Sequence, residues 1–302
     1  MSELLVTKEW LESNKNLVTL KQSTKYPDLF VIKYKNKVFY DNLWTPALLQ
    51  CRGLVLDKDY NVVVRPFDKI FNYMENGTTF DRDDICTYTR KVNGFMGAMT
   101  YSGKYGYIYS TTGSLDSDYA KLVEKHLKQY EDYLNKPGLT VLFEICDYND
   151  PHIIKEDLGA YLIGAVWSTN DWRMGYHETE CTLDDMASMY GLKRFNSKVG
   201  RFSDIVKESK ECKHEGFVVR LQDNQSKLLK LKSPYYLTTK FLARKRGDKL
   251  IELLDNAQQA KKTIDEEYYP LLDCLHDIKE EFVLLPEQDR ITVIENYFKE
   301  MK

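Results

Sequence analysis

The residue best suited to covalent chemistry in this sequence is a lysine that stands three residues before a glycine. The segment reads Lys91-Val92-Asn93-Gly94, directly after Arg90 and before an apparent strand. A lysine amine is a poor nucleophile while it is protonated, and burial or neighbouring cations lower its pKa. Arg90 is such a cation, so Lys91 is a candidate nucleophile. A four-residue pattern is also common in surface turns, and its meaning therefore depends on the motifs around it.

Further motifs flank this lysine on both sides, in order over most of the chain. They are Arg52-Gly53, Arg65 to Asn72, Thr112-Gly113-Ser114, Phe143-Glu144, His214 to Val219 and Lys230 to Tyr236. Lys230 and Lys232 are two residues apart, so on a strand both side chains project from one face. These lysines, like Glu144 and Glu215, are individually compatible with a solvated strand surface. The series as a whole is far more specific than any of its parts.

Composition and charge bound the class of protein. The 302 residues are 43% hydrophobic and 29% charged, which is ordinary for a globular enzyme. A net charge of -3 does not by itself indicate a nucleic-acid binder, but Lys and Arg concentrate in two stretches, 193–213 and 227–249. The six cysteines have no paired spacing, which argues against a zinc site and fits reduced thiols. Without a signal peptide or an uncharged apolar run of about 18 residues, we expect a cytoplasmic protein.

The order of short apolar segments predicts an α+β fold built on antiparallel strands. Strands are expected at 29–34, 53–56, 62–64, 106–109, 140–145, 160–166, 216–221 and 228–231, with hairpin turns at 57–61 and 102–104. Helical spacing interrupts them at 117–134 and 182–190, where Thr182 or a neighbour is the expected cap. About three helices are expected after residue 237. We therefore predict a catalytic domain at 1–240 and a small all-helical domain at 241–302.

Taken together, the motifs resemble those of the covalent nucleotidyltransferase superfamily, whose nucleophile motif is Lys-x-Asp/Asn-Gly. Within it the sequence is most similar to the ATP-dependent RNA ligases of T-even-type bacteriophages, with fungal tRNA ligases as relatives, from about Tyr34 to Tyr236. Two positions depart from the common pattern. Asn93 stands where many members have Asp, and Thr112 stands where the phage relative has a lysine, which weakens any phosphate contact by Thr112.

The resemblance implies an antiparallel-sheet adenylyltransferase domain and a role for each matched residue. Lys91 would be the nucleophile, Glu144 would contact the ribose or organise a metal, and Glu215 would bind the metal. Lys230 and Lys232 would hold the phosphates. The remaining residues of the implied nucleotide site are Tyr34, Arg52, Lys69, Phe71, Gly94 and Tyr236. The implied cofactors are ATP and Mg²⁺, with Mn²⁺ as an alternative, and the implied partner is RNA, either single-stranded or at tRNA ends.

The activity expected from this resemblance is ATP-dependent joining of 5′-phosphate and 3′-hydroxyl RNA ends, in RNA or tRNA repair. The reaction would pass through a lysyl-AMP intermediate and an RNA-adenylate. DNA ligases and capping enzymes share the first step but carry a β-barrel after the last lysine motif, whereas the tail here has helical spacing. An inactive fold retained as an RNA-binding module is the other alternative. The basic run from Lys240 to Arg246 fits either a phosphate contact or a solvated helix face.

Overall fold

The computed structural model describes residues 2–168, 174–256, 261 and 268–300. Its strands form three antiparallel sheets. The first has the order β1 (Ser2–Glu3), β11 (Met174–His177), β10 (Gly159–Ser168), β9 (Leu139–Cys146), β7 (Phe95–Ser102) and β8 (Gly106–Thr111). The second has the order β12 (Lys198–Arg201), β6 (Ile85–Arg90), β13 (Gly216–Leu221) and β14 (Asn224–Lys232). The third has the order β2 (Val18–Gln22), β3 (Leu29–Tyr34), β4 (Arg52–Asp57) and β5 (Val62–Val64).

The helices lie between and beside these sheets. Those of the first two thirds of the chain are α1 (Lys8–Ser13), α2 (Asn36–Tyr40), α3 (Pro46–Gln50), α4 (Asp118–Leu127), α5 (Glu180–Tyr190) and α6 (Phe202–Glu211). The short 3₁₀ turns are η1 (Glu75–Gly77) and η2 (Lys128–Tyr130). The C-terminal helices are α7 (Pro234–Arg244), α8 (Asp248–Asp255), α10 (Tyr269–Asp277), α11 (Lys279–Leu284) and α12 (Glu287–Glu300). None of the described helices is long and apolar enough to cross a membrane.

The predicted α+β fold is confirmed, and every strand predicted above lies within an observed one. Both predicted hairpin turns connect paired strands, β4 to β5 and β7 to β8. Three details were wrong. The helix predicted at 117–134 ends at Leu127 and continues only as a 3₁₀ turn, and the cap of α5 is Thr179, whose hydroxyl accepts a hydrogen bond from the backbone of Thr182. The described part of the C-terminal segment holds five helices, not about three.

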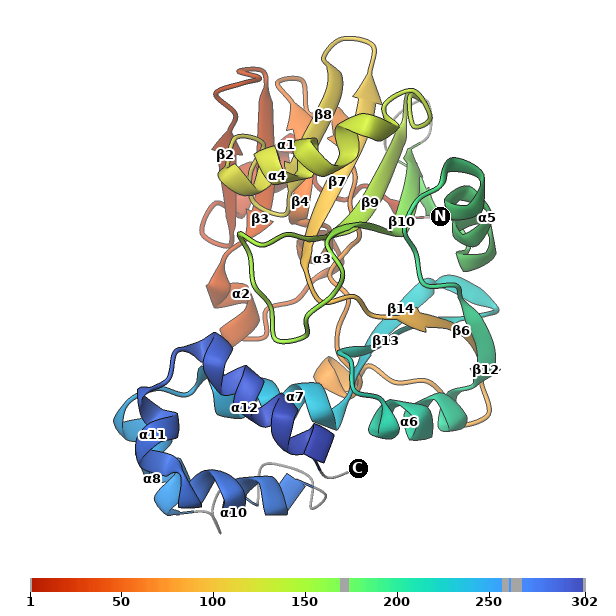
Figure 1. The fold of residues 1–302 in the computed structure, drawn as a ribbon. Helices are drawn as coiled ribbons and strands as arrows, with labels where there is room; N and C mark the ends of the chain where they lie inside the picture. Colours follow the sequence, from red (N-terminus) through yellow and green to blue (C-terminus); the bar gives the residue numbers. More distant parts are fainter. Residues whose placement is uncertain (1, 169–173, 257–260, 262–267, 301–302) are drawn as a thin grey trace.

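The second sheet lies below the first and third sheets in the view of Figure 1. The third sheet packs on the first, where Val31 and Val55 meet Ala98 and Leu142 in one buried cluster. Helix α4 covers the first sheet through another cluster that includes Val123. Lys91 lies in the link between β6 of the second sheet and β7 of the first. The candidate nucleophile is therefore placed where two sheets diverge.

The C-terminal helices share a buried cluster with residues from the sheet-bearing part of the chain. That cluster joins Leu250, Leu272 and Ile294 to Ile153 and Ile154, and to Tyr235 and Tyr236 at the start of α7. Helix α7 begins at Pro234, directly after β14, with the Ser233 hydroxyl capping it, so the predicted boundary at residue 240 falls inside a helix. The helical layer is thus continuous with the end of the lysine-rich strand.

We predict that a protein ending at residue 245 aggregates. The cut removes the partners of Ile153, Ile154 and Tyr235 from their shared cluster and exposes an apolar surface, which favours association. Size-exclusion chromatography and thermal melting of the truncated protein test this. The matched control is Leu284→Ala, whose side chain is 84% exposed and whose loss should leave melting unchanged. A truncated monomer that melts like the full chain would show that the cluster does not support the catalytic part.

Candidate active site

Strand pairing brings the lysine nucleophile candidate beside a buried glutamate. The Lys91 backbone N–H donates to the Gly216 carbonyl at 2.8 Å, extending the β6–β13 ladder and setting Glu215 against Lys91. Gly216 has φ +123°, and a Cβ there would lie 2.0 Å from the Leu231 carbonyl oxygen on β14. Only glycine fits such a close approach of two strands. The glycine that follows Glu215 is therefore a requirement of the backbone path.

Glu215 binds three groups through its carboxylate. Lys91 Nζ lies 2.8 Å from Oε2, and the Asn93 side-chain amide donates to the same oxygen at 2.8 Å. Lys232 Nζ lies 3.8 Å from Oε1. The Asn93 amide oxygen in turn accepts from the Ile154 backbone N–H at 2.9 Å. The amide at position 93 thus supplies a donor that an ionised aspartate would lack, which gives a physical consequence to this departure from the common motif.

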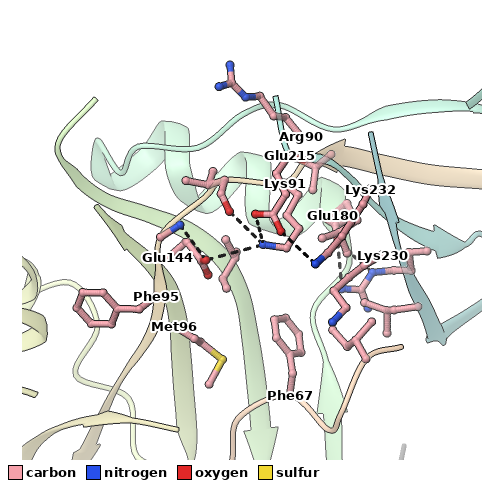
Figure 2. Close-up of a pocket in the computed structure, with 18 of the residues that line it drawn as sticks. Phe67, Arg90, Lys91, Phe95, Met96, Glu144, Glu180, Glu215, Lys230 and Lys232 are labelled. Atoms are coloured by element: carbon pink, nitrogen blue, oxygen red, sulfur yellow. Dashed lines mark hydrogen bonds and ion pairs between the residues drawn. The ribbon is translucent and has the colours of Figure 1, made fainter. Parts of the chain in front are cut away.

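Glu144 stands on the other side of the lysine, on β9. Its Oε1 accepts from the Gly94 backbone N–H at 3.2 Å and lies 3.9 Å from Lys91 Nζ. A Cβ at Gly94 would lie 2.3 Å from the Ile145 carbonyl oxygen, so the glycine permits this contact between the Lys91–β7 link and β9. Lys91 is consequently held between a carboxylate of β9 and the carboxylate of the residue that precedes β13, as Figure 2 shows.

The prediction that the pKa of Lys91 is lowered was wrong. Burial lowers the pKa of Lys91, but Glu144 and Glu215 raise it by more, so its pKa lies above the ordinary value. Arg90, expected to supply a field that lowers this pKa, is paired with Glu156 at 2.7 Å and stacks on the Phe195 ring at 4.4 Å. In this structure the amine is therefore a protonated cation, and chemistry requires its proton to leave first.

The predicted residues converge on one cavity of about 340 Å³. Those that line it are Arg52, Lys91, Gly94, Glu144, Glu215, Lys230 and Lys232. Thr112, the other departure from the motif pattern, lines it as well. Lys230 and Lys232 project from the same face of β14 into this cavity, as their spacing predicts (Figure 2). The predicted residues thus bring two carboxylates and four cations to the cavity.

Tyr34, Lys69 and Phe71 form an adjoining cluster with a residue that the sequence did not reveal. Lys69 Nζ lies 4.6 Å from the Phe71 ring centroid and 5.6 Å from that of Trp44, and Trp44 packs edge-on against Tyr34. Burial raises the pKa of Tyr34, and the neighbouring charge of Arg52 opposes that shift. Trp44 precedes α3 in a segment without motif or periodicity, so no sequence signal marked it. These rings and an ion pair with Glu75 at 3.2 Å hold Lys69 where its charge acts on Lys230.

Lys230 has an unusually low pKa. Burial lowers it, and the neighbouring charges of Lys69, Arg52, Lys232 and Lys91 lower it further, to about 7. Within the described residues no carboxylate oxygen lies within 4.0 Å of its Nζ. A buried ammonium among like charges gains most from a bound anion, because the anion restores the stabilisation that water would give. The charges at this end of the cavity are therefore suited to an anion.

We predict that Lys230 takes up a proton when an anion binds beside it. Anion binding raises the pKa of Lys230 from its starting value of about 7. Binding of tripolyphosphate should therefore be accompanied by uptake of nearly one proton at about pH 8 and of almost none at about pH 6. Affinity should accordingly fall as the pH rises through 7. Isothermal titration calorimetry in buffers of different ionisation enthalpy measures the uptake. Lys230→Gln should abolish it, and equal uptake by that variant would assign the proton to another group.

Tyr236 lies at the opposite end of the lysine row, largely buried. Lys232 Nζ lies 5.2 Å from the Tyr236 ring centroid. The ring also belongs to the cluster shared with the C-terminal helices. Tyr236 thus connects the cavity to the helical layer instead of presenting a free stacking surface.

The carboxylates of Glu144 and Glu215 fit a hard divalent cation. Both reach the same cavity, and oxygen donors are the ligands that Mg²⁺ and Mn²⁺ prefer. Within the described residues no group of three or more His, Cys, Asp or Glu side chains gathers for metal binding. Two carboxylates suffice for Mg²⁺, which usually keeps several waters and takes further oxygens from phosphates.

The sequence analysis also missed a buried ionic network at the back of the cavity. Glu180 and Arg220 both line it, and their side chains are paired at 3.0 Å. Glu180 pairs in addition with Arg194, which binds Asp184 at 2.6 Å. Glu180 lies in the first turn of α5 and Arg220 lies on β13. The ion pairs therefore connect α5, a helix beside the first sheet, to the second sheet. Glu180 and Arg220 are 40 positions apart, and no local sequence pattern predicts an ion pair over that separation.

Comparison with known proteins identifies related sequences and folds. The sequence model of a family described as RNA ligase matches residues 50–242, and no curated protein sequence matches the chain. A solved archaeal ATP-dependent RNA ligase superposes with a TM-score of 0.58 at 13% identity, over 96% of this chain and 79% of that one. A protein from Aquifex aeolicus described as an ATP-dependent DNA ligase superposes with a TM-score of 0.51 at 16% identity, over 91% and 72%. At these identities the structures show a shared fold only.

Proposed function

The chain belongs to the RNA ligase family, and from this membership we propose that it joins RNA 5′-phosphate and 3′-hydroxyl ends through a covalent AMP adduct on Lys91. The observation that carries the proposal is the position of the Lys91 amine. It lies between Glu144 and Glu215 in a cavity that also receives Lys230, Lys232 and Arg52. A nucleophile surrounded by phosphate-binding cations is suited to nucleotidyl transfer.

In the first step, Lys91 Nζ attacks the α-phosphorus of ATP. A nitrogen–phosphorus bond forms, the bond to the β-phosphate oxygen breaks, and pyrophosphate leaves with its electron pair. Lys91 loses its protons to reach the neutral phosphoramidate, and Glu215, which accepts a hydrogen bond from the amine at 2.8 Å, is placed to accept the first of them. Lys230 and Lys232 stabilise the charge that develops on the phosphates.

In the second step, an oxygen of an RNA 5′-phosphate attacks the AMP phosphorus and the bond to Lys91 breaks. The amine recovers a proton, and the product is an RNA capped by a 5′–5′ pyrophosphate to AMP. In the third step, the 3′-hydroxyl oxygen of another end attacks the 5′-phosphate phosphorus and loses its proton to solvent. A phosphodiester bond forms, the pyrophosphate bond to AMP breaks, and AMP leaves with the bonding electron pair. The same cations serve all three steps, because each transfers a phosphoryl centre with growing negative charge on its oxygens.

A divalent cation completes the proposed site. Mg²⁺ held by Glu144 and Glu215 would offset the carboxylate charge that keeps the proton on Lys91 and would screen the phosphates from each other. Lys91 itself is positioned by this chain's own contacts, the backbone ladder to Gly216 and the hydrogen bond to Glu215. The Asn93 amide keeps the glutamate oriented toward the amine.

The alternative functions considered from the sequence, a DNA ligase or capping enzyme and an inactive module, predict different structural features. A DNA ligase or capping enzyme would carry a β-barrel after β14, whereas the described residues there form helices. The likeness to the Aquifex aeolicus protein is one of fold, which hosts both kinds of substrate and does not separate them. An inactive module is disfavoured because the cavity holds all four polar groups required for transfer: Lys91, Glu215, Lys230 and Lys232.

The proposed activity is tested by offering defined ends to the purified protein. We expect ATP and Mg²⁺ to support joining of a 5′-phosphorylated single-stranded RNA to a 3′-hydroxyl RNA end, with GTP far less effective. A nicked DNA duplex is the matched competing substrate. Efficient sealing of the DNA, or a preference for GTP, would overturn the RNA ligase proposal in favour of the related chemistry. Absence of joining, with no AMP transferred to protein, would favour the inactive module.

A further inference from the structure

The cations around the cavity separate into two groups, although Lys230 and Lys232 project from one face of β14. Lys230 has Lys69 and Arg52 as the neighbouring charges that lower its pKa most. Lys232 lies toward Glu215, and its Nζ is 5.2 Å from the Tyr236 ring centroid. One end of the cavity therefore faces the third sheet, and the other faces helix α7.

Helix α7 adds a cation to the second group. Lys240 follows Tyr236 by four residues, about one helical turn, so both lie on the same side of α7. Its Nζ lies 5.7 Å from the Tyr236 ring centroid, on the ring that Lys232 also approaches. Two ammonium groups on one buried ring form a concentrated positive surface, continuous from β14 to α7.

Lys240 lacks the neutralising partner that the nearby arginines have. Burial lowers the pKa of Lys240, Arg244 lowers it further, and Glu215 opposes both. Among the described residues no carboxylate oxygen lies within 4.0 Å of its Nζ. Arg244 and Arg246, by contrast, are paired with Glu287 at 3.1 and 3.4 Å. Within the described part of this basic run, Lys240 and Lys245 have no carboxylate partner; Lys245 lies over the Phe241 ring at 4.6 Å, whereas Lys240 shares the Tyr236 ring with Lys232 of the cavity.

An exposed apolar side chain lies beside Lys240. Leu237 precedes it by three residues, on the same stripe of α7, and is 48% exposed. An unpaired ammonium next to an exposed apolar side chain suits a nucleic-acid strand, whose phosphates bind cations while its sugars and bases contact apolar groups.

We propose that Lys240 binds a backbone phosphate of an RNA substrate strand, and that the Leu237–Lys240 stripe of α7 guides this strand to Lys91. This inference rests on the proposed function, because it assigns one substrate strand to one end of the cavity. The Lys230 end, with Arg52 and Lys69, then remains for the triphosphate. The separation of the two cation groups allows two different phosphate ligands to bind on either side of the nucleophile.

The test is direct binding of RNA to the full-length protein without ATP. Fluorescence anisotropy of a short, labelled, 5′-phosphorylated single-stranded RNA is measured over a series of salt concentrations. We expect Lys240→Gln to weaken binding about tenfold, as loss of one charge-assisted phosphate contact implies. The slope of log affinity against log salt should fall in magnitude by about 0.7, since one phosphate contact is lost from a single strand. Lys240→Arg should retain most of the affinity.

Lys249→Gln is the matched control, because Lys249 is an exposed lysine of α8, beyond the stripe. It should leave both affinity and salt slope at wild-type values. A Lys240→Gln protein with wild-type affinity and slope would overturn the assignment, as would equal losses in both variants. If the wild-type protein forms an AMP adduct but binds no RNA, this inference fails while the adenylyl-transfer chemistry stands. If it binds RNA as expected but forms no adduct, the proposed function fails instead.

Discussion

Lys91→Ala should abolish ATP-dependent joining of RNA ends, by more than about 10⁴-fold, yet still seal RNA supplied with AMP already on its 5′ end. The amine is needed as a nucleophile only in the step that loads AMP, so removing it eliminates the proposed covalent route. Sealing of pre-adenylylated RNA uses the 3′-hydroxyl as nucleophile and AMP as leaving group. The cations that stabilise that step, Lys230 and Lys232, are retained.

Gel electrophoresis of labelled RNA measures both reactions with the same protein preparation. Lys121→Ala is the control, because Lys121 is a surface lysine of α4 paired only with Asp118. It should behave as wild type in both reactions. A Lys91→Ala protein that still joins RNA with ATP would place the nucleophile elsewhere. A folded variant that fails on both substrates would show that Lys91 also organises the cavity, through its contacts with Glu144 and Glu215.

Replacing either lysine of the β14 pair should slow formation of the AMP adduct by about 10²- to 10³-fold, the usual cost of removing one preorganised group that stabilises transition-state charge. Lys230→Gln and Lys232→Gln keep a hydrogen-bond donor of similar length but remove the charge. Arginine is a poor substitute, since its planar fork has a different reach. Single-turnover transfer of radiolabelled AMP to protein gives the rate.

Lys227→Gln is the matched control on the same strand, since Lys227 is exposed and does not line the cavity. Its rate should equal that of the wild type. If both Lys230→Gln and Lys232→Gln form the adduct at the wild-type rate, these lysines have no role in AMP transfer and belong only to the strand surface. A loss in only one would show which end of the cavity holds the α-phosphate.

The sequence was informative wherever the physical signal is local. Short apolar segments between turn residues placed the strands, and the spacing of Lys230 and Lys232 placed both on one face of β14. The convergence of Lys91, Glu144 and Glu215 followed from the resemblance, because residues on three separate strands or links have no local relation. The roles assigned to these residues remain proposals.

The remaining features depend on tertiary contacts that no local pattern encodes. Arg90 is adjacent to Lys91 in sequence, but its side chain turns to Glu156, so adjacency gave the wrong sign for the pKa of Lys91. Trp44 joined the Lys69 cluster through folding of a segment without motif. The extra C-terminal helices were missed because the apolar spacing of α7 continues directly from β14 and that of α11 directly follows α10.

The most direct test of this account is to identify the residue that carries AMP. The wild-type protein is incubated with ATP and Mg²⁺, its intact mass is measured, and the modified peptide is sequenced by tandem mass spectrometry. We predict one AMP per chain, linked to the side-chain nitrogen of Lys91, and none after treatment with excess pyrophosphate, which reverses the step. An unmodified protein, or AMP linked to another residue such as Lys230 or Lys232, would contradict the central claim.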